Sequence, residues 1–291
     1  MSSRPSNAQI RRRRFVALLL GFVALVVVVA AVAAALPRHH HPAAVTTPPA
    51  PPKPFHVVFP EGFTRAQMAE RVGVVAKIAE HKSGKSVTLA RASYLASTRT
   101  VVVPCFAPRR RQAVEGFLFP ATYPFFAKTP SRSLVRQQVV AFCQNWKKVN
   151  LSYARSKNLT PYDVLKIASL VQGEAVVESD RPKIAAVIYN RLHLRMTLGI
   201  DAALRYALDI PGTKSILESQ LQNPTPYNLR LHAGLPPTPI DNPGLASMQA
   251  AAHPAHVDYL YYVAKPDKRH HFFTASATAF EHYECAHGYG C

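Results

Sequence analysis

The stretch Thr160–Ala175, which reads TPYDVLKIASLVQGEA, decides how the main globular part of this chain is interpreted. Thr160 is a favoured N-cap residue, and Pro161 follows it at the first helical position. Asp163 adds an acidic residue to the first turn, where it complements the positive end of a helix. The pattern therefore predicts a helix that begins directly after this threonine.

One face of this predicted helix is apolar and ends in a carboxylate. Steps of three and four residues place on that face Ile167, Leu170, Val171 and Glu174. Such a carboxylate either turns outward to cap the helix end or lies in a low-dielectric site. Desolvation in such a site raises the pKa of the carboxyl, and a general acid that works at neutral pH requires a raised pKa. The pattern alone favours the structural alternative. Glu178 is a rival carboxylate one turn further on, whereas Gln172 points to a different face.

Helix and strand signals also appear on both sides of this stretch. A second helix is predicted from about Asp180 to Leu194. Upstream, the expected elements are a short strand in HVVF, a helix after the capping box of Thr64 and Gln67, a helix near residues 90–98 and a strand at Thr100–Pro104. This order predicts a small α+β module.

The aromatic segment Glu115–Phe126, EGFLFPATYPFF, allows two interpretations. It is either a strand and turn that line the core or an aromatic surface for a sugar ring. Composition favours the core.

The N-terminal region predicts a membrane anchor. Phe15–Leu36 runs for 22 residues without a charge, which is long enough to span a hydrocarbon core of about 30 Å. Arg11–Arg14 precede it and Arg38 alone follows, so the N-terminus is expected in the cytoplasm and the rest outside. A cleaved signal peptide is the alternative, since Ala33–Ala35 are small, but the apolar run exceeds the usual signal core.

A Pro-rich spacer follows this apolar run. Between His39 and Pro54 there are six prolines in sixteen residues, which favours an extended, unpacked chain. The tract His39–His41 has no packed surroundings to orient metal ligands, so we interpret it as incidental.

Composition and charge narrow the class of protein. The chain has 291 residues, 48% of them apolar, which excludes a disordered chain. Lys and Arg number 35 against 16 Asp and Glu, a net charge of +19. Outside a membrane, this charge fits anionic lipid head groups or acidic wall polymers, and a nucleic-acid partner is not expected.

Four cysteines are too few for a disulfide scaffold. Two disulfides are predicted, Cys105 with Cys143 and Cys285 with Cys291, and a zinc site in the tail ranks below the second pair.

Several ordered motifs resemble those of one enzyme family, the endolytic murein transglycosylases or YceG-like proteins. That family's pattern reads about ASI(V/I)E-x-EA, NRL, M-x-LQ-x-D, YNT, GLPP-x-PI-x-NPG, YLYFV and HxF. The corresponding residues here are Ala168–Ala175, Asn190–Leu192, Met196–Asp201, Tyr227–Asn228, Gly234–Gly244, Tyr259–Val263 and His271–Phe273. PEGFT and EGFLFPATY resemble the family's LysM-like N-terminal part. The chain departs from the pattern at Gly199, Ala203 and Leu229, which bears on the sugar subsites.

The resemblance implies an α+β fold, with a single transmembrane helix, a small LysM-like α+β module and a mixed α/β catalytic domain. Together with the residue patterns above, it divides the chain into a basic arm at 1–14, the transmembrane helix at 15–36, a linker at 37–54, the LysM-like module at 55–126, the catalytic domain at 127–284 and a tail at 285–291. It also implies membrane and peptidoglycan partners, association with peptidoglycan synthases, and no metal or other cofactor.

The implied activity is cleavage of the β-1,4 bond after N-acetylmuramic acid, with a 1,6-anhydro end as product. Because Gln172 replaces the first of the family's two glutamates, the resemblance assigns the acid to Glu174. The residues expected to bind substrate are Asn190, Arg191, Asp201, Tyr227 and Asn228. A wall-binding scaffold and a muramidase that uses water are the alternatives.

Overall fold

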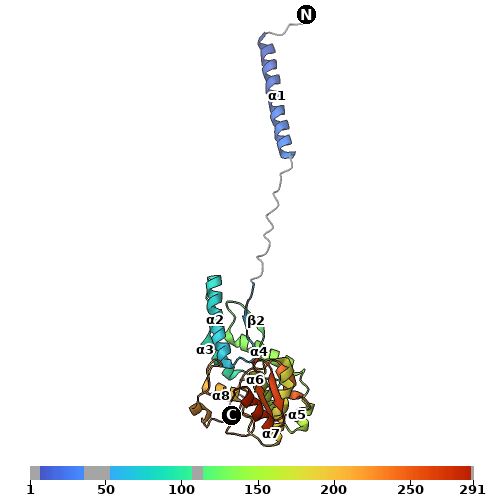
Figure 1. Ribbon diagram of the computed structural model, residues 1–291. Coiled ribbons are helices and arrows are strands. Elements are labelled where there is room, and N and C mark those ends of the chain that lie inside the picture. Colours follow the sequence, from blue (N-terminus) through green and yellow to red (C-terminus); the bar gives the residue numbers. More distant parts are fainter. Residues whose placement is uncertain (1–6, 36–52, 107–113, 290–291) are drawn as a thin grey trace. The chain divides into compact units, whose positions relative to one another are not determined.

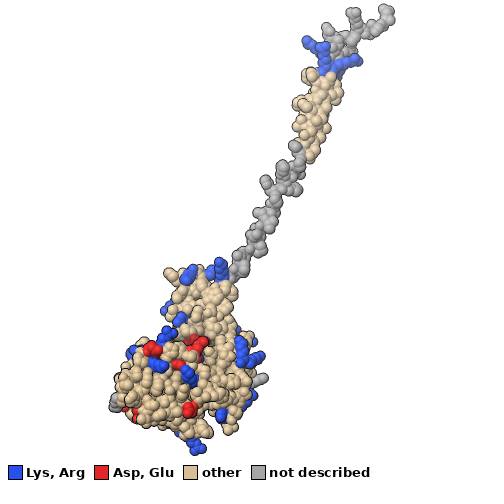
Figure 2. Space-filling model, turned by 45° about the vertical axis from the view of Figure 1, so that its right-hand side comes forward, with Lys and Arg blue, Asp and Glu red and all other residues tan. Residues whose placement is uncertain are grey.

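The computed structural model describes residues 7–35, 53–106 and 114–289, and these divide into two compact units, up to Pro52 and from Lys53 on (Figure 1). The first unit contributes one helix, α1 (Asn7–Ala35). Its segment Arg11–Ala35 is long and apolar enough to cross a membrane. Figure 2 shows Lys and Arg side chains at one end of this apolar helix. The fold therefore fits a single-pass anchor, and its orientation remains a prediction. The spacer and the His39–His41 tract lie almost wholly outside the described residues.

The second unit begins with the elements of the small α+β module. They are β1 (Phe55–Val58), α2 (Arg65–Ser83), α3 (Arg91–Thr100) and β2 (Thr122–Phe125). The predicted capping box is confirmed, because the Thr64 hydroxyl accepts from the Gln67 N–H and the Gln67 side chain accepts from the Thr64 N–H. The disulfide Cys105–Cys143 is confirmed as well and joins the chain after α3 to α4. Cys291 of the other predicted pair lies outside the described residues.

The prediction of a strand at Thr100–Pro104 is wrong. Helix α3 continues to Thr100, irregular chain follows, and β1 instead pairs antiparallel with β2, with Val57 opposite Tyr123. The physical reason is burial: Tyr123 and Phe125 alternate inward along β2, whereas Val102 is 53% exposed. The core interpretation of the aromatic segment is correct, since Phe117 and Phe125 are buried.

The remaining elements are mostly helices. They are α4 (Ser131–Trp146), α5 (Ser152–Ser156), α6 (Pro161–Glu174), the 3-10 turn η1 (Glu178–Asp180), α7 (Arg181–His193), α8 (Asp201–Leu208), α9 (Glu218–Leu221), α10 (Leu245–Ala252), the antiparallel hairpin of β3 (Tyr261–Ala264) and β4 (His271–Thr274), and α11 (Ala277–Ala286). Helix α6 packs against α7, α8 and α10. The described chain is therefore α+β, with helices predominating.

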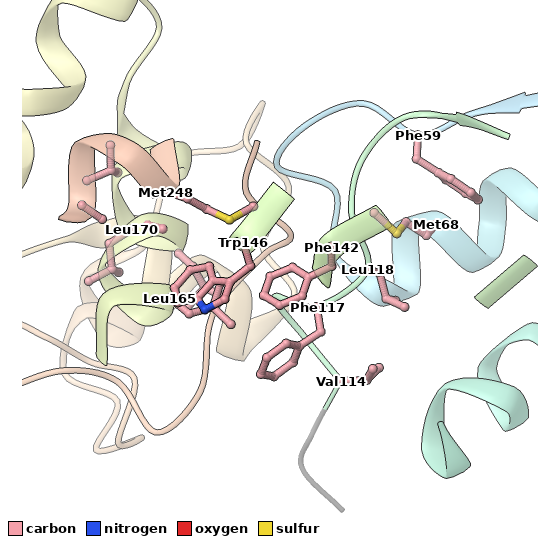
Figure 3. Packing of buried hydrophobic residues seen from close by; sticks show 14 of the residues in the cluster. Phe59, Met68, Val114, Phe117, Leu118, Phe142, Trp146, Leu165, Leu170 and Met248 are labelled. Carbon is pink, nitrogen blue, oxygen red and sulfur yellow. The ribbon is translucent and has the colours of Figure 1, made fainter. Parts of the chain in front are cut away.

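One continuous core links the small module to these helices. Figure 3 shows Phe59 and Met68 on one side, Phe117 and Phe142 in the middle, and Leu170 with neighbouring apolar residues on the other. Because this core is continuous from Lys53 onward, the division between a LysM-like module and a catalytic domain near residue 126 stays a prediction.

Candidate active site

Helix α6 places Glu174 at its last residue. Its start is the expected one, since the Thr160 side chain accepts from the Asp163 N–H and Asp163 accepts from the Thr160 N–H in return. Ile167, Leu170 and Val171 are fully buried. Burial of each such side chain contributes about 1.5–3 kcal/mol. A rotation of α6 that returned Glu174 to water would expose them, so packing holds the carboxylate in place.

Glu174 is partly buried, and burial raises its pKa to about 7. The hydroxyl of Tyr262 donates to Glu174 Oε2 at 3.3 Å, and the N–H of Ala202 at the start of α8 also bonds this carboxylate; both oppose the rise. From an ordinary value of 4.5 the change costs about 3 kcal/mol for the ionised form. The free energy gained by burying the three apolar residues of the same face is larger than that cost. The site thus has the low dielectric that a general acid requires.

The rival carboxylate lies in a different environment. Glu178 is in η1, its side chain is 91% exposed, and its carboxylate is 3.8 Å from a guanidinium nitrogen of Arg181. Glu178 therefore lacks the buried setting in which general acids are commonly found. The geometry favours Glu174 over Glu178 as the residue that donates a proton.

A cavity of about 700 Å³ lies beside the end of α6. The neighbours of Glu174, Gly173 and Ala202, form part of its wall. The start of α2, the end of α8 and the loop before α10 form the rest, and their side chains include Arg65, Gln67, Glu115, Arg205, Tyr206, Tyr227, Ile240 and Asp241. This volume lies in the range of small-ligand sites and is compatible with binding a sugar chain.

Glu115 is a buried carboxylate of this cavity that sequence reasoning missed. Oε1 accepts from the Arg65 N–H at 2.8 Å and from the Asn242 amide at 2.7 Å, and Oε2 accepts from the Tyr206 hydroxyl at 3.3 Å. Burial raises its pKa to about 7 against these hydrogen bonds. Asn242 in turn accepts from the N–H groups of Gly116 and Leu118. The network fixes the loop before α10 against the small module. The acidic residue at the start of EGFLFP was the only sequence signal for it.

The residues predicted to bind substrate fall into two groups. In the first group the side chains donate hydrogen bonds to backbone carbonyls of the protein itself; these residues are Asn190, Arg191 and Asn228. The Asn190 amide donates to the carbonyls of Val257 and Tyr259, Arg191 Nε donates to the Leu260 carbonyl at 2.6 Å, and the Asn228 amide donates to the carbonyls of Leu221 and Asn223. These contacts position β3 and the loop after α9. A direct role of the three in substrate binding remains only a prediction.

Two of the predicted residues lie nearer to the candidate acid. Asp201 is the first residue of α8, next to Ala202, and forms a bidentate pair with Arg230 at 2.6 and 3.0 Å. Its negative charge adds to the rise in the pKa of Glu174. Tyr227 lines the cavity, with its hydroxyl 2.8 Å from the Thr238 hydroxyl. The structure thus brings Tyr227 to the cavity, and it places Asp201 next to Ala202 of the cavity wall.

The three departures from the motif pattern are largely structural positions. Ala203 and Leu229 are buried, and the Gly199 N–H donates to the Leu229 carbonyl at 2.8 Å. Gly199 has φ +64°, a conformation that favours glycine over the glutamine usual in the motif.

Tyr262 is the other residue that sequence reasoning missed. It lies on β3, and the ring of His271 from β4 packs perpendicular to it at 5.4 Å. His271 is held by Asp180, which accepts from its backbone N–H at 2.8 Å and lies 3.1 Å from its ring Nδ1. The sequence did carry a signal, because this chain reads YLYYV where the motif reads YLYFV. Among the described residues, no group of His, Cys, Asp and Glu is arranged to hold a metal ion.

Comparison with known proteins places this geometry in a family. The sequence model of the YceG-like family matches residues 33–285. The chain belongs to the YceG-like family. Among YceG-like structures, that of a putative yceG-like protein from Listeria monocytogenes superposes with a TM-score of 0.66, at 28% identity, over 80% of this chain and 76% of that one.

Two curated relatives carry the name endolytic murein transglycosylase. The protein from Bacillus subtilis (strain 168) is 36% identical over 57% of this chain and 46% of its own length. The protein from Streptococcus pneumoniae (strain ATCC BAA-255 / R6) is 33% identical over 72% of this chain and 40% of its own length. This YceG-like chain therefore spans less than half the length of these relatives.

Proposed function

We propose that this protein is a membrane-anchored endolytic lytic transglycosylase that cleaves peptidoglycan glycan strands. The observation that carries the proposal is the position of Glu174, a carboxyl with a pKa near 7 beside a 700 Å³ cavity. The names of the curated relatives support the same class of substrate. The apolar helix α1 supports the anchor, and the arginines before it favour a cytoplasmic N-terminus with the remainder outside. Peptidoglycan synthases are the proposed partners.

The proposed reaction uses Glu174 twice. As an acid, the protonated carboxyl gives its proton to the glycosidic oxygen, and the bond from that oxygen to C1 of N-acetylmuramic acid breaks. As a base, the carboxylate then accepts the proton of the C6 hydroxyl of the same sugar while O6 bonds to C1. The product end is a 1,6-anhydro ring, no water is consumed, and Glu174 regains its proton. The intramolecular attack gains from proximity, so no activated water is needed.

The groups around Glu174 serve both steps. The Tyr262 hydroxyl and the Ala202 N–H stabilise the carboxylate that forms after the first proton transfer. Burial opposes that stabilisation and keeps the acid form populated near neutral pH. In this scheme Tyr227 contacts the glycan in the cavity. Asn190, Arg191 and Asn228 support the walls, and Asp201 orients the start of α8.

Mass spectrometry of the products tests the proposal. Purified full-length protein in detergent is incubated with isolated peptidoglycan sacculi, and the released and internal chain ends are analysed. We expect 1,6-anhydro-muramic ends formed within strands. Reducing muramic ends would identify a muramidase that uses water, and bound but uncut strands would identify a wall-binding scaffold.

A further inference from the structure

Asp241 is a second cavity carboxyl, and the proton transfers proposed for Glu174 make no use of it. It is 5% exposed, lies on the loop before α10 and lines the same cavity. Its Oδ1 is buried, and none of the described residues donates a hydrogen bond to it. Buried polar atoms in folded proteins nearly always have partners, because an unpaired one is costly. The missing donor therefore requires an explanation.

The loop holds this carboxyl firmly in place from both sides. The N–H of Ile240 donates to the Ser169 hydroxyl of α6 at 3.1 Å. The N–H of Asn242 donates to the Phe63 carbonyl at 3.1 Å, and its side chain joins the Glu115 network. With both neighbours fixed, Asp241 cannot easily swing out to find water. Its orientation is set by the fold before any ligand arrives.

Two glycines lie beside the Asp241 carboxyl. A Cβ on Gly173 would lie 3.7 Å from Asp241 Oδ2, and a Cβ on Gly62 would lie 3.9 Å from it. Both glycines line the cavity, and Gly173 immediately precedes Glu174. Asp241 thus lies in the cavity wall beside Gly173, the residue that precedes the candidate acid.

The charges around Asp241 argue against a built-in ion pair. Burial raises its pKa well above the ordinary value, and the nearby carboxylates of Glu115 and Glu61 reinforce the rise. Arg65 also lines the cavity, but its guanidinium donates to the Thr98 hydroxyl at 3.4 Å. A carboxyl in this setting suits an uncharged hydrogen-bond donor that enters with a ligand.

We propose that Asp241 is a glycan-recognition residue whose carboxyl accepts a hydrogen bond from a hydroxyl or acetamido N–H group of the strand bound next to Glu174. This inference rests on the proposed function and deepens it. Glycan strands present such donors on every ring, and Ile240 beside the carboxyl offers apolar contact to the sugar or its acetyl methyl. The unpaired carboxyl lowers the stability of the protein while the cavity is empty, and it strengthens binding once the strand supplies a donor.

Two measurements of opposite sign test this role. The first is thermal unfolding of full-length protein in detergent at pH 8 without glycan. Asp241→Ala removes the unsatisfied carboxyl, so we expect the midpoint to rise by about 2–4 °C. Asp241→Asn is the second variant, in case truncation disturbs the loop. Asp258→Asn, at an exposed position, is the control and should leave the midpoint unchanged.

The second measurement is binding, with Glu174→Gln in all proteins so that the strand is not cut. The probes are a peptide-free tetrasaccharide of alternating N-acetylglucosamine and N-acetylmuramic acid, and the β-1,4 glucose tetrasaccharide, which has hydroxyls in place of the acetamido groups. We expect Asp241→Ala to weaken binding of the first by about 10-fold. A loss for the first probe alone would assign the donor to acetamido N–H, and a loss for both would assign it to a hydroxyl.

Other outcomes would overturn the inference. Unchanged binding with Asp241→Ala, or a lowered midpoint in both variants, would make Asp241 a structural residue. Failure of both variants to fold would likewise show that Asp241 is a structural residue. If the Glu174→Gln protein with native Asp241 binds neither probe, the proposed function falls together with this inference. If that protein binds and the Asp241 variants bind equally well, this inference alone falls.

Discussion

Replacing Tyr262 by phenylalanine removes one atom from the environment of Glu174 and should move its titration. The Tyr262 hydroxyl donates to Glu174 Oε2 at 3.3 Å, which stabilises the ionised form and lowers the pKa. A hydrogen bond to a charged group contributes about 1.5–3 kcal/mol at ideal geometry. At this longer distance we take about 1 kcal/mol, which corresponds to about 0.7 in pH.

The direction of the change follows from the role of the acid. Glu174 must be protonated to start the reaction, so kcat/KM should fall as the pH rises through its pKa near 7. Without the Tyr262 hydroxyl that pKa rises further. The alkaline limb of the profile should therefore move by about 0.7 pH unit to higher pH in Tyr262→Phe.

The assay follows release of anhydro-muramic ends from peptidoglycan between pH 5 and 9. Tyr261→Phe is the matched control, because Tyr261 is the preceding residue of β3 and its ring packs against Phe280 and Arg191. Its limb should coincide with that of the native protein. An active Tyr262→Phe enzyme with an unmoved limb would refute the coupling between this hydroxyl and Glu174.

Three further predictions concern stability and placement. Glu115→Ala should lower the free energy of unfolding by about 3 kcal/mol or more, because three donors lose their acceptor, and a thermal midpoint equal to the native one would contradict this. Cys105→Ser should cost about 2–4 kcal/mol in chemical unfolding, and complete alkylation of native Cys105 and Cys143 without reductant would exclude their bridge. Protease added to intact spheroplasts should remove the region from Phe55 on, whereas protection would reverse the proposed orientation.

The sequence predicts best what depends on neighbouring residues. The helix from Pro161 to Glu174 and its Thr160 N-cap are confirmed, because an N-cap, a proline and a periodic apolar face all lie within fifteen residues. The prediction of a strand at Thr100–Pro104 was wrong for the converse reason. Strand pairing depends on residues far apart in the sequence, and β1 pairs with Thr122–Phe125.

The candidate site could be predicted only in part for the same reason. The position of Glu174 follows from its own helix, but the bond from Asn242 to Glu115 joins residues 127 apart. Tyr262 and Asp241 likewise reach the cavity or the acid only when distant segments pack together. The local residue pattern indicates which helix carries the candidate acid, whereas tertiary packing decides which side chains surround that acid.

The paired replacements Glu174→Gln and Glu178→Gln test the central claim most directly. Each keeps the shape of the side chain and removes the transferable proton, and the two sites lie one helical turn apart in sequence. The measurement is the rate at which each folded variant forms 1,6-anhydro-muramic ends from purified peptidoglycan. We predict a loss of about 10²–10⁴-fold for Glu174→Gln and native activity for Glu178→Gln. Native activity of Glu174→Gln, or loss of activity only in Glu178→Gln, would contradict the assignment of Glu174 as the acid.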